Sequence, residues 1–176
     1  MSITTKTGDN GKTSLLFGER ASKSDLRVKA IGTLDELCSF MGLSKSLLRD
    51  KGVKKIIEDI QRDLFIIGAE TATLPKYLYK LEKRIDKRFV LKLDELLRQW
   101  ENKNKFKSRC FYLPGENIIS SSFDVSRAVA RRAERELVTL EGKKGIKNPD
   151  MLIYLNRLSD LLYLFARNYE NKPKRK

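Results

Sequence analysis

Apolar residues recur every three or four positions along most of this chain, which is the spacing of helices with one buried face. Five segments share this pattern, and they span about residues 26–48, 56–74, 77–102, 119–140 and 151–169. Gly52 and Pro75 interrupt the pattern, while Pro149 suits the first turn of the last helix because no amide hydrogen is needed there. The pattern contains no convincing β-sheet and no interdomain linker. It predicts an all-α fold, a bundle of five helices in one domain.

Histidine is absent from the 176 residues, and this limits the chemistry that the chain can perform. Histidine is the commonest general base near neutral pH and a common metal ligand, so its absence argues against serine–histidine and zinc-hydroxide catalysis. Cys38 and Cys110 are too few for a disulfide framework or a structural zinc site. No apolar run reaches the roughly 20 residues of a membrane-spanning helix, and the opening residues lack the apolar core of a secretion signal. We expect a cytoplasmic protein with no membrane attachment.

The chain is strongly basic, with 37 Lys and Arg against 23 Asp and Glu and a formal net charge of +14. A helical nucleic-acid-binding protein is one interpretation, because clustered cations gain from counterion release. The excess is spread along the chain, however, and only the tail at 171–176 is a basic run. A solvated lysine-rich surface with sites for an acidic metabolite explains this distribution better.

A polar segment near the start, Thr5–Ser14, combines glycines, hydroxyls and lysines. Glycines let backbone N–H groups approach a phosphate closely, and the side chains supply further donors. Two residues separate Gly8 from the Gly11-Lys12 pair, whereas the P-loop of nucleotide triphosphatases has four and follows a strand. The segment is therefore no P-loop. An anion-binding loop and a plain polar arm remain as interpretations.

Arginines form a ridge on the segment 119–140. At 100° per residue, Arg127, Arg131 and Arg135 share one face with Glu134 beside them. The opposite ridge is apolar and contains Val125, Val129, Ala133 and Leu137. A solvated face is one explanation, but the ridge is all arginine in a lysine-rich chain, and guanidinium groups bind phosphates bidentately and form ion pairs across interfaces. Together with Thr5–Ser14, the ridge predicts a site for a phosphate-rich small molecule.

Three other polar residues carry little information by themselves. Asp35 and Glu36 lie early in the first helix, where negative charge is favourable. Asn156 is polar within the apolar pattern of the last helix, and a hydrogen bond inside the bundle explains it as well as a ligand contact does.

Taken in order, these segments resemble one family, the PduO-type ATP:cob(I)alamin adenosyltransferases, also called corrinoid adenosyltransferases. The matching motifs are Thr5–Asp9 with Gly11, Lys23, Gly32–Leu37, Ile60–Phe65, Ile67–Glu70, Phe111 with Leu113–Gly115, Arg127–Arg135 and Tyr154–Asp160. The likeness spans nearly the whole chain, and the third helix is its least informative part.

The resemblance implies a homotrimer of five-helix bundles with active sites between neighbouring subunits. Residues 1–24 would form a nucleotide-binding loop, residues 25–170 the bundle and residues 171–176 a basic tail. The implied ATP-binding residues are Thr5, Lys6, Thr7, Gly8, Thr13, Ser14 and Lys23 of one subunit with Arg131, Arg132, Glu134, Arg135 and Asn156 of the next. Asp35 and Arg127 match a pair that forms an intersubunit salt bridge and helps to place the corrinoid. Phe111 matches the aromatic ring beneath the corrin, and with Asp35, Arg127 and Arg131 it completes the implied catalytic set.

The implied reaction suits a chain without histidine. Co(I) of the corrinoid attacks the 5′ carbon of ATP and triphosphate leaves, so no protein base has to create the nucleophile. The protein aligns the two reactants and neutralises the leaving group. The apolar ring of Phe111 would favour a four-coordinate cobalt that accepts an electron readily. Mg²⁺ would accompany ATP without an identified protein ligand, and a reductase and an adenosylcobalamin-dependent enzyme would be partners.

Two positions depart from the family pattern, and two other functions stay open. Asp124 stands where the family often has histidine, and Cys38 stands where asparagine commonly follows Asp-Glu-Leu. One rival is an escort protein that holds adenosylcobalamin without turnover. The other is a nucleic-acid binder, whose salt-sensitive binding would survive Arg131→Ala.

Overall fold

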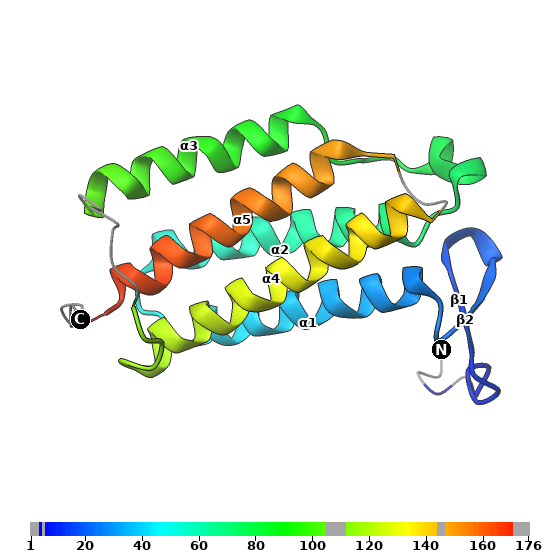
Figure 1. Cartoon of the computed structure of the whole chain (residues 1–176), viewed down its shortest axis with the longest axis horizontal. Helices are drawn as coiled ribbons and strands as arrows, with labels where there is room; N and C mark the ends of the chain where they lie inside the picture. Colours follow the sequence, from blue (N-terminus) through cyan, green and yellow to red (C-terminus); the bar gives the residue numbers. More distant parts are fainter. Residues whose placement is uncertain (1–3, 5, 105–111, 144–146, 171–176) are drawn as a thin grey trace.

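Five long helices form an up-and-down bundle in the computed structural model, which describes residues 4, 6–104, 112–143 and 147–170. They are α1 (Leu26–Leu47), α2 (Lys51–Thr71), α3 (Lys87–Asn104), α4 (Ile118–Gly142) and α5 (Pro149–Asn168). Successive helices run in opposite directions along the bundle (Figure 1). The all-α five-helix architecture predicted from the apolar spacing is therefore confirmed.

The helices are held together by one apolar core. α1 packs between α2 and α4, and α5 packs between α4 and α3. Aromatic rings fill the core near one end of the bundle. The ring of Phe165 contacts those of Trp100 and Phe123 edge-on, with ring centroids 4.7 and 5.3 Å away. The outward faces of α1 and α4 remain available for polar chemistry.

Local sequence fixes where the helices begin. The carboxylate of Asp50 accepts hydrogen bonds from the amides of Gly52 and Val53, at 2.8 and 3.1 Å, and so caps α2. Asn117 caps α4 in a reciprocal arrangement with Ser120. Pro149 occupies the first turn of α5, as predicted.

The third helix begins later than predicted. The apolar spacing indicated a helix from Tyr77, but a 3-10 helix, η2 (Pro75–Lys80), is followed by an irregular segment, and α3 begins only at Lys87. The cause is Glu70, a fully buried carboxylate at the end of α2. It accepts hydrogen bonds from the guanidinium of Arg84 at 2.7 and 2.9 Å and from the amide of Ile85 at 3.3 Å. These contacts hold the segment before α3 outside any helix.

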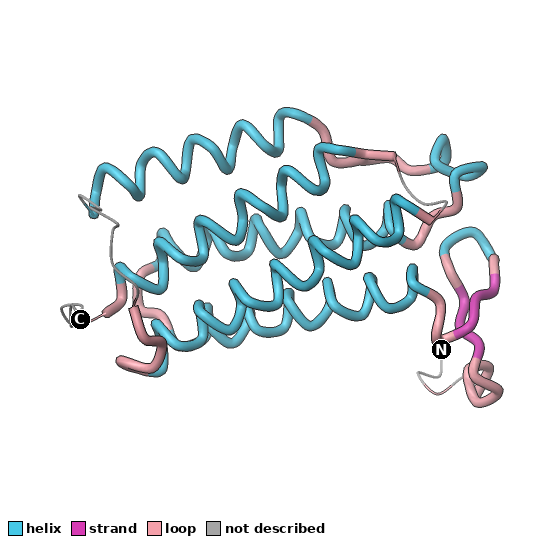
Figure 2. The backbone as a smooth tube through the Cα atoms, viewed as in Figure 1, coloured by secondary structure: helices cyan, strands magenta, loops and turns pink. Residues whose placement is uncertain are grey.

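A short β-hairpin precedes the bundle, which the sequence pattern did not reveal. β1 (Lys12–Ser14) pairs antiparallel with β2 (Arg20–Ser22), and the 3-10 turn η1 (Leu16–Gly18) joins them (Figure 2, magenta). Strands of three residues are too short to show the alternation of polar and apolar positions by which strands are recognised. The hairpin lies at the end of the bundle where α1 and α5 begin and α4 ends (Figure 1).

None of the helices in the described ranges is both long enough and apolar enough to cross a membrane.

A buried hydrogen bond joins α2 to α5 and leads to a testable prediction. The hydroxyl of Tyr154, on a side chain with no exposed surface, donates to the Asp63 carboxylate at 2.8 Å. Tyr154→Phe keeps the packing but leaves the carboxylate without this donor, so we expect a loss of about 1–3 kcal/mol in the free energy of unfolding at pH 7. Urea titration measures this loss.

The loss caused by Tyr154→Phe should depend on pH. Burial raises the pKa of the Asp63 carboxyl above its ordinary value of 3.8, and the hydrogen bond from Tyr154 opposes this shift. The cost of a buried charge is therefore absent at low pH and grows as the pH rises through the pKa of the folded protein. We expect a smaller loss at pH 4 than at pH 7. Tyr79→Phe, at a side chain 79% exposed, should stay within about 0.5 kcal/mol. A loss equal for both variants would contradict this prediction.

Candidate functional site

The N-terminal loop is folded into tight turns ahead of β1. The amide of Asp9 donates to the carbonyl of Lys6, and the amide of Gly11 to the carbonyl of Gly8, both at 3.3 Å. Lys6 and Gly11 have left-handed backbones, with φ of 56° and 75°, which is strained for a lysine and ordinary for a glycine. Lys6, Thr7 and Ser14 are exposed, and Gly8 and Thr13 are half-buried. Thr5 lies outside the described residues.

Lys23 and Gly8, both predicted ATP-binding residues, lie close together in the loop. A Cβ added to Gly8 would meet the ammonium nitrogen of Lys23 at 3.3 Å, a tight contact that would require the end of the lysine side chain to shift by a few tenths of an ångström. The amide of Lys23 also donates to the carbonyl of Gly11 at 2.9 Å. The loop therefore places a lysine directly over its glycine.

Arg20 stabilises this loop, and the sequence interpretation missed it. Its guanidinium donates to the carbonyl of Thr7 at 2.7 Å and to the hydroxyl of Ser14 at 3.1 Å. The register of the hairpin, which pairs Ser14 with Arg20, makes the second contact possible. Because the hairpin itself left no visible pattern, no signal in the sequence pointed to Arg20.

The hairpin is anchored to the end of α2 and to η2. The amide of Leu16 donates to the carbonyl of Ala72 at 3.2 Å. Glu19 forms an ion pair with Lys76 at 2.6 Å and accepts a hydrogen bond from the hydroxyl of Tyr77 at 3.3 Å. The loop is thus held in a fixed place at one end of the bundle (Figure 1).

The arginine ridge of α4 lies at the surface at two of its three positions, and Arg127, the first of them, is half-buried. Arg131 and Arg135 are exposed, and a guanidinium nitrogen of Arg135 donates to the carbonyl of Arg131 at 3.0 Å. On the opposite ridge Val129, Ala133 and Leu137 are buried. The expectation for the first member of that ridge was wrong: Val125 is 41% exposed, because the buried face at this turn of α4 is formed by Phe123 and Ser126, and Val125 lies beside it.

Glu134 and Asn156, both predicted ATP-binding residues, are brought together across α4 and α5. The amide nitrogen of Asn156 lies 3.4 Å from a carboxylate oxygen of Glu134, and its amide oxygen accepts from Arg157 at 3.0 Å. Arg157 is in turn bound to Asp94 of α3 at 2.9 Å. Asn156 is therefore oriented by its neighbours rather than free to rotate.

Arg132 forms an ion pair with Glu36 of α1 within the same chain. The two side chains are 43% and 44% exposed, so the pair is accessible to a competing anion. A neighbouring contact reinforces this seam between α1 and α4: the hydroxyl of Thr33 donates to Glu136 at 2.6 Å.

Within one chain, Arg127 faces a different carboxylate from the one expected across the trimer interface. Its Nε lies 3.8 Å from Asp124 of its own helix, and Asp35 is exposed on α1. Phe111, the predicted ring beneath the corrin, lies outside the described residues.

The loop and the arginine ridge occupy separate parts of one chain. The hairpin lies beyond the start of α1, near the end of α4 (Figure 1). Arg131 precedes the last residue of α4, Gly142, by 11 positions (142 − 131), or roughly 16 Å along the axis. A ligand that contacts both the loop and the ridge would therefore require a site formed by two chains.

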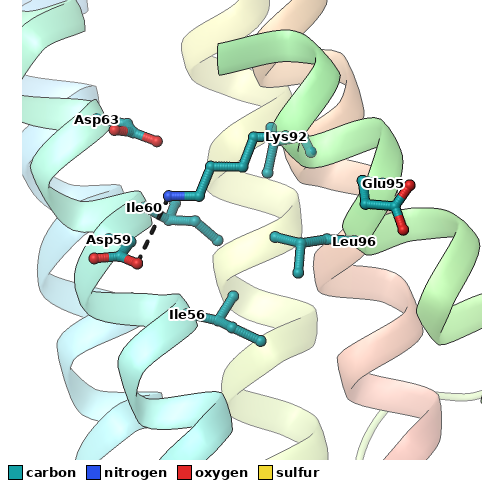
Figure 3. A pocket seen from close by; sticks show the side chains of 8 residues that line it. Ile56, Asp59, Ile60, Asp63, Lys92, Glu95 and Leu96 are labelled. Carbon is teal, nitrogen blue, oxygen red and sulfur yellow. Dashed lines mark ion pairs between the residues drawn. The ribbon is translucent and has the colours of Figure 1, made fainter. Parts of the chain in front are cut away.

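Two hollows lie away from every predicted site residue. A cavity of about 170 Å³ between α2 and α3 has apolar walls that include Ile56, Ile60 and Leu96, and an ion pair of 3.6 Å between Lys92 and Asp59 crosses it (Figure 3). A wider groove of about 920 Å³ runs past the start of α3 to Asn148. No predicted site residue lies on α2 or α3, so these hollows are separate from the candidate site.

Comparisons with known proteins agree with the resemblance seen in the motifs. Residues 3–169 match the family model for cobalamin adenosyltransferase. A corrinoid adenosyltransferase of Citrobacter freundii is 37% identical over 172 residues, which cover 97% of this chain and 96% of that protein. The corrinoid adenosyltransferase PduO of Salmonella typhimurium is also 37% identical, but the match spans only 49% of its length.

A solved structure gives the same result for the fold. A phenylalanine-to-histidine variant of a PduO-type ATP:corrinoid adenosyltransferase from Lactobacillus reuteri, complexed with cobalamin and ATP, superposes with a TM-score of 0.88. The identity is 32%, and the superposition covers 98% of this chain and 94% of that one. This chain belongs to the cobalamin adenosyltransferase family.

Proposed function

We propose that this protein transfers the 5′-deoxyadenosyl group of ATP to the cobalt of a reduced corrinoid. The observation that carries the proposal is the family match over residues 3–169, together with relatives named corrinoid adenosyltransferases. The exposed cations on α4 and in the N-terminal loop supply the chemistry that a triphosphate requires.

The reaction forms one bond and breaks one bond. The electron pair of Co(I) attacks the 5′ carbon, a cobalt–carbon bond forms, and the bond from that carbon to the triphosphate oxygen breaks. The products are adenosylcobalamin and triphosphate. Because the nucleophile is the metal of the substrate, the protein contributes alignment and stabilisation of the leaving charge.

The nucleotide would be held by residues of two subunits. The loop would contribute Thr5, Lys6, Thr7, Gly8, Thr13, Ser14 and Lys23, and α4 and α5 of the neighbour would contribute Arg131, Arg132, Glu134, Arg135 and Asn156. Lys23 beside Gly8 supports this assignment, since it places a cation within the glycine-containing loop. The Glu134–Asn156 contact supports it as well, because it presents an oriented amide beside the arginines.

The corrinoid would lie beside the same interface. Arg127 and Asp35 would place it, and Phe111 would fill the space beneath the ring and keep a lower ligand from the cobalt. A four-coordinate cobalt accepts the electron that makes Co(I) more readily than a five-coordinate one.

Mg²⁺ and the homotrimer are further parts of the proposal. Mg²⁺ prefers phosphate oxygens and water, so we propose that it enters bound to ATP. Three-fold assembly would bring the loop of one chain to the arginine ridge of the next, which one chain by itself keeps apart. A reductase that supplies the electron and an enzyme that uses adenosylcobalamin would be partners, and the cytoplasmic location stays a prediction.

An anaerobic assay tests the function directly. Chemically reduced cobalamin, ATP and Mg²⁺ are mixed with the protein, and the absorbance change of cobalt–carbon bond formation is followed. We expect one triphosphate for each adenosylcobalamin. Adenosylcobalamin binding with no turnover would favour the escort protein instead. A flat trace with folded protein that binds no corrinoid would overturn both interpretations.

A further inference from the structure

A cluster of buried charges lies where α4 packs against the end of α5. Asp124, Arg167 and Glu170 have side chains only 8%, 2% and 3% exposed. A guanidinium nitrogen of Arg167 lies 2.5 Å from Asp124 Oδ2 and 2.9 Å from Glu170 Oε1. Arg127 completes the cluster, with its Nε 3.8 Å from Asp124 Oδ1. Two cations therefore share two carboxylates.

Asp124 divides its two oxygens between the two arginines. Oδ2 is occupied by Arg167, which the rings of Tyr112 and Tyr163 also hold, with the guanidinium carbon 5.5 and 5.2 Å from their centroids. Oδ1 faces Arg127. Because Arg167 contacts two carboxylates and two aromatic rings, its position is fixed, and it fixes the Asp124 carboxylate beside Arg127.

The inner edge of the Arg127 side chain is buried. Its Nε has almost no accessible surface and no hydrogen-bond partner within the described part of the chain, although 34% of the side chain is exposed. A separation of 3.8 Å is too long for a hydrogen bond. It still attracts strongly where water is excluded, and a small movement would close it.

We infer that Asp124 is a positioning residue for Arg127. The Asp124 carboxylate attracts the Nε edge of Arg127 toward the bundle, so that the rest of the Arg127 side chain has one orientation at the proposed corrinoid site. The inference rests on the proposed function, and it gives a role to one of the two positions where this sequence departs from the family pattern.

A purely structural role is the alternative, in which Asp124 only neutralises Arg167. Glu170 provides the matched control, because it contacts the same arginine but forms no contact with Arg127 among those resolved in the described ranges. Glu170→Gln and Asp124→Asn each remove one carboxylate charge from Arg167 with little change in shape. Both should lower stability, but only Asp124→Asn should affect Arg127.

The test is a double-mutant cycle with Arg127→Lys, read as KM for cob(I)alamin and, separately, KM for ATP. We expect Asp124→Asn to raise the corrinoid KM roughly tenfold, about 1.4 kcal/mol, with the ATP KM changed less than about twofold. In the Arg127→Lys background the same change should have little further effect. Glu170→Gln should leave both KM values near those of the wild type.

Several results would overturn the inference. Equal corrinoid KM values for Asp124→Asn and Glu170→Gln would do so, as would an undiminished effect of Asp124→Asn in the Arg127→Lys background. If Asp124→Asn does not fold, Asp124→Glu keeps a counterion for Arg167 but displaces the carboxylate, and a normal corrinoid KM for that variant would also overturn it. In all these cases an active wild type leaves the proposed function intact, whereas an inactive wild type removes both.

Discussion

Arg131→Ala should lower kcat/KM for adenosyl transfer by about 10²–10³-fold while the protein remains folded. The guanidinium is proposed to stabilise negative charge that builds on the triphosphate as it leaves, so the loss should fall mainly on kcat. Arg131 is exposed and lies outside the core, and the free energy of unfolding should therefore change by no more than about 0.5 kcal/mol. Steady-state kinetics and urea titration measure the two effects.

Arg98→Ala is the control for Arg131→Ala. Arg98 is an arginine on α3 whose side chain is 72% exposed, and it pairs with Glu95 of the same helix. Removing it lowers the net charge by the same amount but should change kcat/KM less than about twofold. Equal losses in the two variants would indicate a general electrostatic effect and would contradict the role assigned to Arg131. Nucleic-acid binding that depends on salt and survives Arg131→Ala would favour the rival interpretation.

Phe165→Ala should cause the largest loss of stability, about 3–5 kcal/mol. Phe165 has no exposed surface, and its ring fits between those of Trp100 and Phe123. Truncation removes both edge-on contacts and leaves a cavity that α3, α4 and α5 cannot all close. For a chain of 176 residues, the midpoint of thermal unfolding should fall by roughly 6–20 °C.

Phe65→Ala makes the same substitution on the outer face of α2, where the side chain is 67% exposed. It should change the free energy of unfolding by no more than about 0.5 kcal/mol. Calorimetry of the unfolding of both variants shows whether the loss of stability depends on the burial of the phenylalanine or only on its removal. If Phe165→Ala lowered the free energy of unfolding only slightly, the aromatic packing between α3, α4 and α5 would not be a main source of stability.

The bundle could be predicted from sequence because its helices have long apolar stripes and clear starts. Leu34, Leu37 and Met41 repeat at helical spacing and are buried in α1. Pro149 marks the start of α5. Such signals repeat over many residues, so tertiary packing rarely overrides them.

The features that sequence reasoning missed depend on contacts between distant residues. The buried Glu70 binds Arg84 and Asn148, and it delays α3 although the local apolar spacing continues. Arg20 holds the loop only because a three-residue hairpin brings it to Ser14. Asp124 looked like a simple departure from the family pattern, and its link to Arg167 is visible only once α4 and α5 are packed.

The sequence predicted which residues form the candidate site, but not the ion pairs that they make within one chain. The sequence predicted that Arg131 and Arg135 share a face, and both are exposed on α4. It could not predict that Arg132 pairs with Glu36 inside one chain. That pair implies that a nucleotide must compete with a carboxylate for Arg132, so Arg135 should contribute more to initial binding.

The nucleotide is proposed to be bound by the loop of one subunit and the α4 ridge of another, and subunit complementation tests this shared site most directly. Lys6→Ala and Arg131→Ala chains, each nearly inactive alone, are co-expressed with different tags, and hybrid assemblies are purified and assayed. Each hybrid trimer, of either composition, pairs an intact loop with an intact ridge at one of its three interfaces, so the hybrids should show about a third of wild-type activity. Hybrid assemblies as inactive as either parent would contradict a shared site.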